Sequence, residues 1–259
     1  MNWSLMLRSY NCEYCGRPCS SHAPHAKFCS KQCNDKSRNV QYDGELASDL
    51  RVFSRLPQDE REAILLGKDE RFKVVAFDIE ATHLKANVGR ILCCSFKPLD
   101  GDTYTFSALE PRFRRADVYD DGALALAIIE ELEKFSIIVS WNGKNFDTKF
   151  INARSMRAGN RTKDKQYHVD GMWSWRSKAA AWSGLAAVQQ FIDGGGAEKT
   201  SVKWDQWMRA IGWDQTLREA AMAEIIDHCE RDVVVLEEVY KLIVAANVVR
   251  SIRADGGVL

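Results

Sequence analysis

Four carboxylates in apolar surroundings constrain the fold of this chain more than any other feature. They lie in three separated stretches, with Asp78 and Glu80 in the first, Asp147 in the second and Asp232 in the third. A carboxylate drawn toward a core costs free energy unless a cation meets it, and divalent ions prefer oxygen ligands. We therefore expect a fold that gathers the three stretches around a divalent metal site.

Composition indicates one substantial core with a small appendage, because the chain has 259 residues, of which 46% are hydrophobic and 28% charged. The 36 basic and 36 acidic side chains cancel, so a nucleic acid would be bound through local patches rather than net charge. No apolar run approaches the roughly 18 residues of a membrane span, and the first eight residues lack the apolar stretch of a secretory signal. We expect a cytoplasmic chain with no membrane partner.

Five of the eight cysteines lie between positions 12 and 33. In a reducing compartment such density indicates a zinc site rather than a disulfide framework, because closely spaced pairs of thiolates can complete a tetrahedron. The predicted ligands of one structural Zn²⁺ are Cys12, Cys15, Cys29 and Cys33. Cys19, His22 and His25 are spare ligands, and the alternative is a flexible arm with free thiols. The first cysteine pair resembles a zinc knuckle, and the second resembles the helix-start half of treble-clef fingers.

Three segments are predicted along the chain. Residues 1–41 form the finger, which carries an excess of Lys and Arg and either contacts phosphates or serves as a structural or protein-binding module. Residues 42–71 form a linker with a connecting helix, since apolar residues recur at helical spacing from Leu56 to Leu66 before Gly67. Residues 72–259 form the main domain.

The main domain opens with a predicted strand over residues 73–80. Period two places Asp78 and Glu80 on one face of this strand and Phe77 and Ile79 on the other, so the two acids can share a cation. Residues 89–96 and 103–106 are the next strands, joined by a hairpin turn at 99–102. The first strands of the sheet are therefore predicted to be antiparallel.

A strand-helix-strand unit then makes the sheet mixed. Residues 121–135 have helical spacing and residues 137–141 form a buried strand, which should run parallel to an earlier one. Carboxyl ends of parallel strands share an edge, so Asp147 can approach Asp78 and Glu80. The last helix, about 216–247, places His228 and Asp232 four residues apart on one face. The predicted fold class is α/β, with a mixed sheet flanked by helices.

These residues resemble, in order and spacing, the DEDD family of RNase H-like 3′-to-5′ exonucleases. The three motifs that carry the resemblance are Phe77-Asp-Ile-Glu80, Asn142-x-x-x-Phe-Asp147 and His228-x-x-x-Asp232-Val. Further matches favour the branch of the family B DNA polymerase proofreading domains and YprB-like proteins, namely His168-Val-Asp170, Leu185-Ala-Ala, Lys199-Thr200 and Trp204-x-x-Trp207. One departure is that His228 stands four residues before Asp232, the spacing of the tyrosine branch, whereas the histidine branch has five.

The resemblance implies an α/β fold with an RNase H-like mixed five-stranded sheet flanked by helices, preceded by the small zinc finger, and it implies two Mg²⁺ or Mn²⁺ ions. Asp78, Glu80 and Asp232 would hold one ion, and Asp78 would bridge to a second ion bound by Asp147 directly or through water. His228 would take the proton from the attacking water. The implied substrate contacts are Asn142, Phe146 and Lys199.

The leading functional hypothesis is a two-metal 3′–5′ exonuclease acting on the 3′ end of single-stranded DNA or RNA, with replication or repair proteins as candidate partners. The alternatives are a structure-specific RNase H-like endonuclease of the junction resolvase type and a non-catalytic nucleic-acid-binding adaptor. The D-x-E spacing of Asp78 and Glu80 argues for the exonuclease group.

Several residues keep two interpretations. Asp170 is either an acid that supports the site or a strand end. A basic set either follows the substrate phosphates or forms a solvated face; its members are Arg112, Arg114, Arg115, Arg154, Arg157, Arg161, Lys163 and Lys165. A tryptophan set is expected to lie mostly in the core, with base stacking as the alternative; its members are Trp173, Trp175, Trp182, Trp204, Trp207 and Trp213.

Overall fold

The computed structural model describes residues 8–12, 17–21, 26–30, 53, 56–113, 120–164, 166–179, 184–192, 202–249 and 254–255. The chain divides into two compact units, Met1–Phe53 and Ser54–Leu259. The division falls inside the predicted linker of residues 42–71, and the predicted domain boundaries stay a prediction.

The first unit contains a small antiparallel hairpin. Strand β1 (Arg8–Asn11) pairs with β2 (Pro18–Ser21), with Arg8 opposite Ser21. The backbone N–H of Cys12 donates to the carbonyl oxygen of Arg17 at 2.9 Å and closes the hairpin. The Tyr10 hydroxyl donates to the carbonyl oxygen of Phe28 at 3.0 Å, so the segment after the hairpin lies against it.

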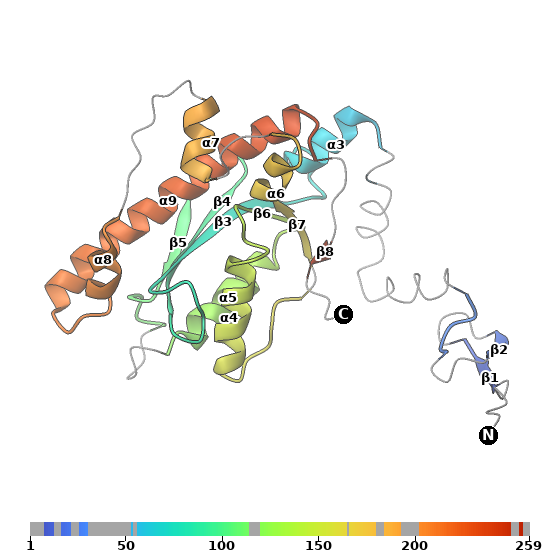
Figure 1. The fold of residues 1–259 in the computed structure, drawn as a ribbon, viewed down its shortest axis with the longest axis horizontal. Helices are drawn as coiled ribbons and strands as arrows, with labels where there is room; N and C mark the ends of the chain where they lie inside the picture. Colours follow the sequence, from blue (N-terminus) through green and yellow to red (C-terminus); the bar gives the residue numbers. More distant parts are fainter. Residues whose placement is uncertain are drawn as a thin grey trace. The chain divides into compact units, whose positions relative to one another are not determined.

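The second unit is built on a mixed sheet with the strand order β5-β4-β3-β6-β7-β8 (Figure 1). Its strands are β3 (Val74–Ala81), β4 (Ile91–Pro98), β5 (Tyr104–Ser107), β6 (Ile137–Ser140), β7 (Gln166–Asp170) and β8 (Ala254–Asp255). Strands β3, β4 and β5 pair antiparallel, whereas β3, β6 and β7 pair parallel. The predicted mixed sheet is confirmed. The two-residue β8 adds a sixth strand, which is too short to carry a sequence pattern.

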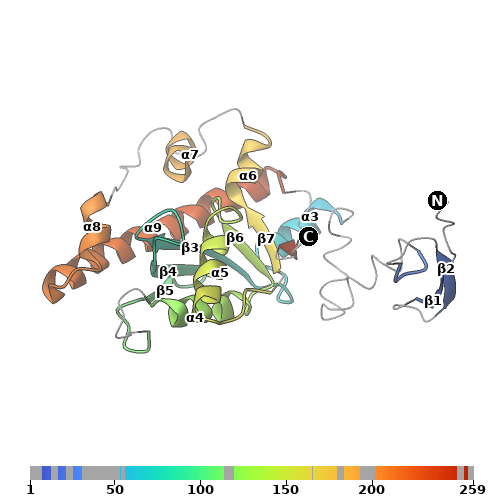
Figure 2. The ribbon, with the colours of Figure 1, turned by 60° about the horizontal axis from the view of Figure 1, so that its bottom comes forward.

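Seven helices surround this sheet in the described part of the chain. They are α3 (Gln58–Leu65), α4 (Gly122–Leu132), α5 (Asp147–Arg157), α6 (Gly171–Arg176), α7 (Leu185–Ile192), α8 (Trp204–Arg209) and α9 (Gln215–Ala245). The sheet lies between α9 on one face and the pair α4 and α5 on the other (Figures 1 and 2). Among the helices of the described residues, none has both the length and the apolar character that a membrane crossing requires.

Period two on β3 divides the core between these two faces. Phe77 and Ile79 join the buried cluster that includes Leu124 and Ile128 of α4. On the other face, buried residues of β4 pack against Met222, Ile225 and Cys229 of α9. Asp78 and Glu80 consequently point toward α9, where a second set of acids is available.

Candidate active site at the carboxyl end of strand β3

Asp78 lies directly beneath the long helix α9. The Cys229 thiol of this helix is 3.5 Å from the backbone carbonyl oxygen of Asp78 and 3.6 Å from its Oδ2 atom, and it donates a hydrogen bond to both. Cys229 is fully buried in the stripe that α9 presents to the sheet. Because the buried stripe of α9 packs on the sheet at Cys229, the polar residues of α9 next to Cys229 lie near Asp78.

His228 and Asp232 extend the site from α9 toward Glu80. The Nε2 atom of His228 is 3.7 Å from Glu80 Oε1 and 3.8 Å from Asp232 Oδ2, so the imidazole stands between the two carboxylates. A spacing of four residues places His228 and Asp232 on one helical face. The first and third sequence motifs therefore meet at the imidazole of His228.

Asp147 joins the site at the first turn of α5. Its Oδ1 atom accepts a hydrogen bond from the backbone N–H of Ile79 at 3.2 Å, and its side chain is buried, with 2% of the residue exposed. The parallel pairing of β3 with β6 ends at Ala76 and Val139. Beyond this point β6 no longer lies beside β3, and the backbone N–H of Ile79 donates to the Asp147 side chain instead. The second motif thus contacts β3 between Asp78 and Glu80.

The turn that leads from β6 to Asp147 is fixed by a buried carboxylate. Asp170 accepts hydrogen bonds from the backbone N–H of Asn142 at 3.0 Å and of Lys144 at 3.2 Å. Asn142 has a positive φ of 67°, a conformation that Asn tolerates better than most residues. Asp170 is thus both the last residue of β7 and the acceptor that holds the turn before Asp147, so its two interpretations are compatible.

Gly143 is required in this turn because the backbone approaches its neighbours closely. A Cβ atom at position 143 would stand 2.3 Å from Ser140 Oγ and 3.1 Å from Asp147 Oδ2. The Ser140 hydroxyl accepts from the N–H of Gly143 at 3.1 Å and hydrogen-bonds to Nε2 of buried His168 at 2.6 Å. This chain of contacts ties the turn to strand β7.

Trp207 supplies a direct hydrogen bond to the site. Its indole N–H donates to Glu80 Oε2 at 3.0 Å from the short helix α8. The partly buried ring also packs beside the core cluster of α9. In the sequence, Trp207 stands out only as one of the tryptophan set and of a pair that resembles the family, because no local pattern links it to Glu80, 127 positions earlier.

The carboxylates of this site hold their protons more tightly than exposed ones. Burial raises the pKa of Glu80 to about 7, against the effect of the Trp207 N–H, and the charges of Asp232 and Asp147 raise it further. Burial also raises the pKa of Asp147 to about 7, against its backbone hydrogen bonds. The pKa of Asp78 is raised well above its ordinary value by burial and then by Cys229 and the neighbouring acids.

Asp232 follows the same trend, since burial raises its pKa and His228 opposes the rise. Buried acids that repel one another are stabilised in their ionised form by a bound divalent cation, whose charge offsets the repulsion. The oxygen donors fit Mg²⁺ or Mn²⁺, which prefer carboxylates. In the side-chain positions of the described residues, no three Asp, Glu, His or Cys groups already form a metal-binding cluster.

The predicted substrate contacts have different surroundings. Asn142 directs its Oδ1 atom to the side-chain amide of Asn145 at 3.2 Å. Phe146 is half-buried, lies 5.5 Å from the ring of Phe150 and packs against the core cluster of the sheet. Lys199 lies outside the described residues.

Two of the four predicted zinc ligands are described. Cys12 is buried and Cys29 is exposed, and both thiols, with that of Cys19, contribute to the raised pKa of Tyr10, after burial as the largest cause. Cys15 and Cys33 lie outside the described residues. The structure therefore leaves the zinc site a prediction.

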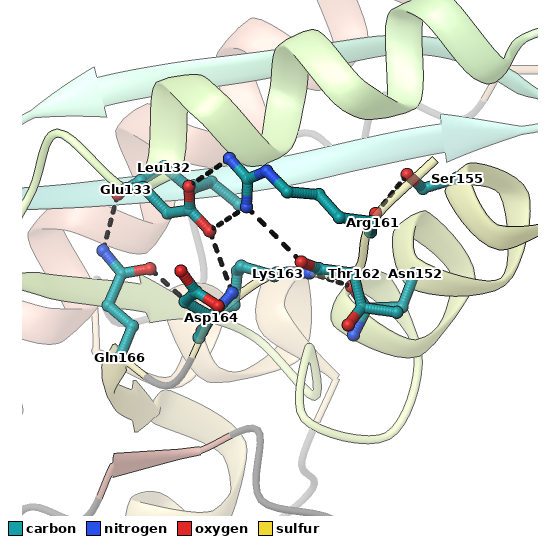
Figure 3. A network of polar contacts seen from close by, with 9 residues as sticks. All are labelled: Leu132, Glu133, Asn152, Ser155, Arg161, Thr162, Lys163, Asp164 and Gln166. Carbon is teal, nitrogen blue, oxygen red and sulfur yellow. Dashed lines mark hydrogen bonds and ion pairs between the residues drawn. The ribbon is translucent and has the colours of Figure 1, made fainter. Parts of the chain in front are cut away.

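Most described members of the basic set form internal contacts rather than a phosphate track. Arg154 is 2% exposed and pairs with buried Asp121 at 2.6 Å. Figure 3 shows how Arg161 pairs with Glu133, while the backbone N–H of nearly buried Lys163 donates to Asn152. These contacts hold the connection from α5 to β7. The phosphate hypothesis is wrong for Arg154 and Lys163, because burial removes both from the substrate.

Arg112 also makes internal contacts, since it pairs with Glu110 and lies over the Phe106 and Phe113 rings. Arg157 is exposed at the end of α5. Arg114, Arg115 and Lys165 lie outside the described residues.

The expectation that the tryptophans lie mostly in the core is wrong for Trp173 and Trp213, whereas Trp207 packs against a core cluster. Trp173 is 58% exposed and Trp213 is fully exposed, while Trp175 and Trp207 are partly buried. Trp182 lies outside the described residues, as does the side chain of Trp204. Short helices α6 and α8 have too few turns to bury one complete face, so large side chains on them remain accessible.

Comparisons with known proteins give a family match and a similar solved structure. No curated protein matches the chain. A solved structure of the family B DNA polymerase from the hyperthermophilic archaeon Pyrobaculum calidifontis is similar with a TM-score of 0.47 and 17% sequence identity, over 64% of this chain and 24% of the polymerase chain. The family model RNase_H_2, described as RNase_H superfamily, matches residues 75–244, which is more than half of the chain and includes all four site acids. The chain therefore belongs to the RNase_H superfamily.

Proposed function

We propose that this protein is a metal-dependent nuclease that removes nucleotides from the 3′ end of single-stranded DNA or RNA. The observation that carries the proposal is the meeting of three distant segments at β3. Asp147 of α5 contacts the strand at Ile79, His228 of α9 stands beside Glu80, and Asp232 stands beside His228. Membership of the RNase_H superfamily supports hydrolysis of phosphodiester bonds. The resemblance of the three motifs to the DEDD exonucleases supports the 3′-to-5′ direction.

The acids are assigned to two ions. Asp78, Glu80 and Asp232 would hold the first, and Asp78 and Asp147 would hold the second. When bound, a pair of Mg²⁺ or Mn²⁺ ions supplies an activated water and neutralises charge on the phosphate and the leaving oxygen. Raised carboxylate pKa values mean that metal binding competes with protons and becomes stronger as the pH rises.

His228 is assigned to accept the proton of the attacking water at its Nε2 atom. The His228 side chain is partly exposed, and its Nε2 atom stands 3.7 Å from Glu80 Oε1 and 3.8 Å from Asp232 Oδ2, beside the acids assigned to the first ion. Trp207 and the Asp170-held turn keep Glu80 and Asp147 in place while the proton moves. Trp207 and Asp170 therefore act as positioning residues, whereas His228 takes part in the proton transfer.

The finger is proposed to be a separate zinc module. Cys12, Cys15, Cys29 and Cys33 would hold one Zn²⁺, and its net positive charge suits contact with nucleic acid or with replication or repair proteins. The hairpin carries Cys12 at its end, next to the segment with Cys29. Removal of the finger is expected to change binding more than hydrolysis.

End-labelled oligonucleotides with free or blocked 3′ ends test the proposal. With magnesium or manganese, the wild type should shorten the free 3′ end one nucleotide at a time and leave the blocked end intact. Asp78→Asn removes a charge assigned to both ions and should lower the rate by orders of magnitude. Asp227→Asn is the matched control, because Asp227 lies on α9 beside His228 but is exposed and pairs with Arg231.

The other outcomes identify the alternatives. Internal cleavage of branched duplexes by the wild type, insensitive to a blocked 3′ end, would identify a structure-specific endonuclease. Binding without cleavage of single-stranded, duplex or branched substrates would identify an adaptor. Equal rates for Asp78→Asn and Asp227→Asn would refute the assignment of the site.

A further inference from the structure

Helix α6 presents an exposed aromatic and basic face beside the candidate site. Trp173 is 58% exposed although tryptophan usually loses most of its surface on folding. Arg176 follows three residues later and is also exposed, and a spacing of three places both residues on the same side of the helix. Lys178 is exposed just after the helix ends.

The opposite side of α6 is occupied by the fold. The Trp175 ring meets Phe191 of α7 edge to face, with 6.0 Å between ring centroids. Ser174 donates its hydroxyl to the backbone carbonyl oxygen of Asp170 at 3.0 Å. These contacts fix the helix and leave Trp173 turned to solvent, where it is a rigid flat surface.

Topology places this surface at the same edge of the sheet as the acids. Strands β3, β6 and β7 are parallel, so their carboxyl ends lie together, and α6 begins directly after β7 (Figures 1 and 2). One oxygen, Asp170 Oδ1, accepts from the backbone N–H of Asn142 at 3.0 Å and of Trp173 at 3.3 Å. The turn that leads to Asp147 and the backbone of Trp173 are therefore joined through a single buried carboxylate.

The charge pattern identifies the class of partner. Between Gly171 and Ile192 the sequence has two basic residues, Arg176 and Lys178, and no Asp or Glu. A flat ring with cations beside it matches an unpaired nucleotide, whose base stacks on the ring and whose phosphate meets the cation. Paired bases are already stacked on each other, so a duplex offers no free face to Trp173.

We propose that α6 is a binding surface for unpaired nucleotides, with Trp173 as the stacking platform and Arg176 and Lys178 as phosphate contacts. This inference rests on the proposed function, because it assigns the substrate strand a course from the acids at β3 across the turn at Asn142 to α6. Stacking on an indole tolerates any base, so the surface selects single strands rather than a sequence.

Fluorescence anisotropy of labelled oligonucleotides of about 20 nucleotides, without added magnesium or manganese, tests the surface. Trp173→Ala should weaken binding of the single strand by about 5- to 150-fold, whereas Trp173→Phe should retain most of the affinity because a ring remains. Trp213→Ala is the matched control, since Trp213 is a fully exposed tryptophan in the connection between α8 and α9. It should leave the affinity unchanged.

Two further measurements specify the mode of binding. The loss on Trp173→Ala should be confined to the single strand and absent from a blunt duplex of the same sequence. Arg176→Ala should reduce the slope of log affinity against log salt concentration by about 0.7, the value for one phosphate contact on a single strand. Equal affinities of Trp173→Ala and Trp213→Ala for the single strand, or an equal loss on the duplex, would overturn the proposal.

The proposed catalytic function is measured separately with the p-nitrophenyl ester of thymidine 5′-monophosphate. This small phosphodiester carries one nucleoside and no further unpaired nucleotides, so its hydrolysis by the wild type with manganese does not require a strand bound on α6. Absence of hydrolysis of both this ester and oligonucleotides would refute the catalytic function. The anisotropy results would still decide whether α6 binds unpaired nucleotides.

Discussion

Replacement of Glu80 by Gln is expected to stabilise the metal-free protein while it abolishes nuclease activity. In the folded protein burial raises the pKa of Glu80 to about 7, from an ordinary value of 4.5. The folded carboxyl group therefore holds its proton more tightly than the unfolded one. Its favourable contribution is fully present below about pH 4.5 and is lost as the pH rises through about 7.

The magnitude follows from this difference. Each pKa unit corresponds to about 1.4 kcal/mol, so ionisation of Glu80 lowers the free energy of unfolding by about 3 kcal/mol at pH 8 relative to pH 4. Gln carries no charge at either pH, and its side-chain oxygen can still accept the Trp207 N–H. Glu80→Gln should therefore raise the free energy of unfolding by up to about 3 kcal/mol at pH 8 and have little effect near pH 4.

Urea unfolding of the wild type and Glu80→Gln at pH 4 and pH 8, in the presence of a chelator, measures this difference. In thermal scans at pH 8, the unfolding midpoint of Glu80→Gln should be about 6 to 12 °C higher than that of the wild type. The matched control is Glu238→Gln, at an exposed position of the same helix that carries His228. Magnesium should stabilise the wild type at pH 8 and Glu80→Gln much less. A stabilisation that is equal at both pH values, or a loss of stability at pH 8, would refute the electrostatic reasoning.

Three further predictions concern neighbouring groups. Trp207→Phe removes the N–H that holds Glu80 but keeps an aromatic ring, so the apparent Mn²⁺ affinity should fall by about 10- to 100-fold in a spectroscopic titration. An unchanged affinity would show that Trp207 does not position Glu80 for the metal. His228→Ala should lower turnover by about two to four orders of magnitude, with His228→Tyr retaining more activity; near-normal rates for both would show that the imidazole is not the base. Elemental analysis should find about one zinc per chain, lost when Cys12 and Cys15 are both replaced by Ser, and protein purified without chelator but free of zinc would contradict the finger.

Local pattern was sufficient to predict the elements that carry the acids. Period two on the strand at residues 73–80 separates Asp78 and Glu80 from Phe77, and the observed β3 has this division because it follows from strand geometry alone. A helical spacing of four residues likewise predicts that His228 and Asp232 share a face, and both are found within 3.8 Å of each other. The parallel pairing of β3 with β6 then explains why Asp147, which follows β6, reaches the same edge of the sheet.

Tertiary structure alone decided which side chains support these acids. Trp207 meets Glu80 across 127 residues, and Asp170 joins the turn at Asn142 to helix α6, because packing of α8 and β7 brings them there. Arg154 carries a charge that its sequence context indicates for the surface, yet Asp121 allows it to be buried as an ion pair. Strand and helix periods are properties of a few consecutive residues, whereas the partner of a polar side chain depends on where distant elements pack.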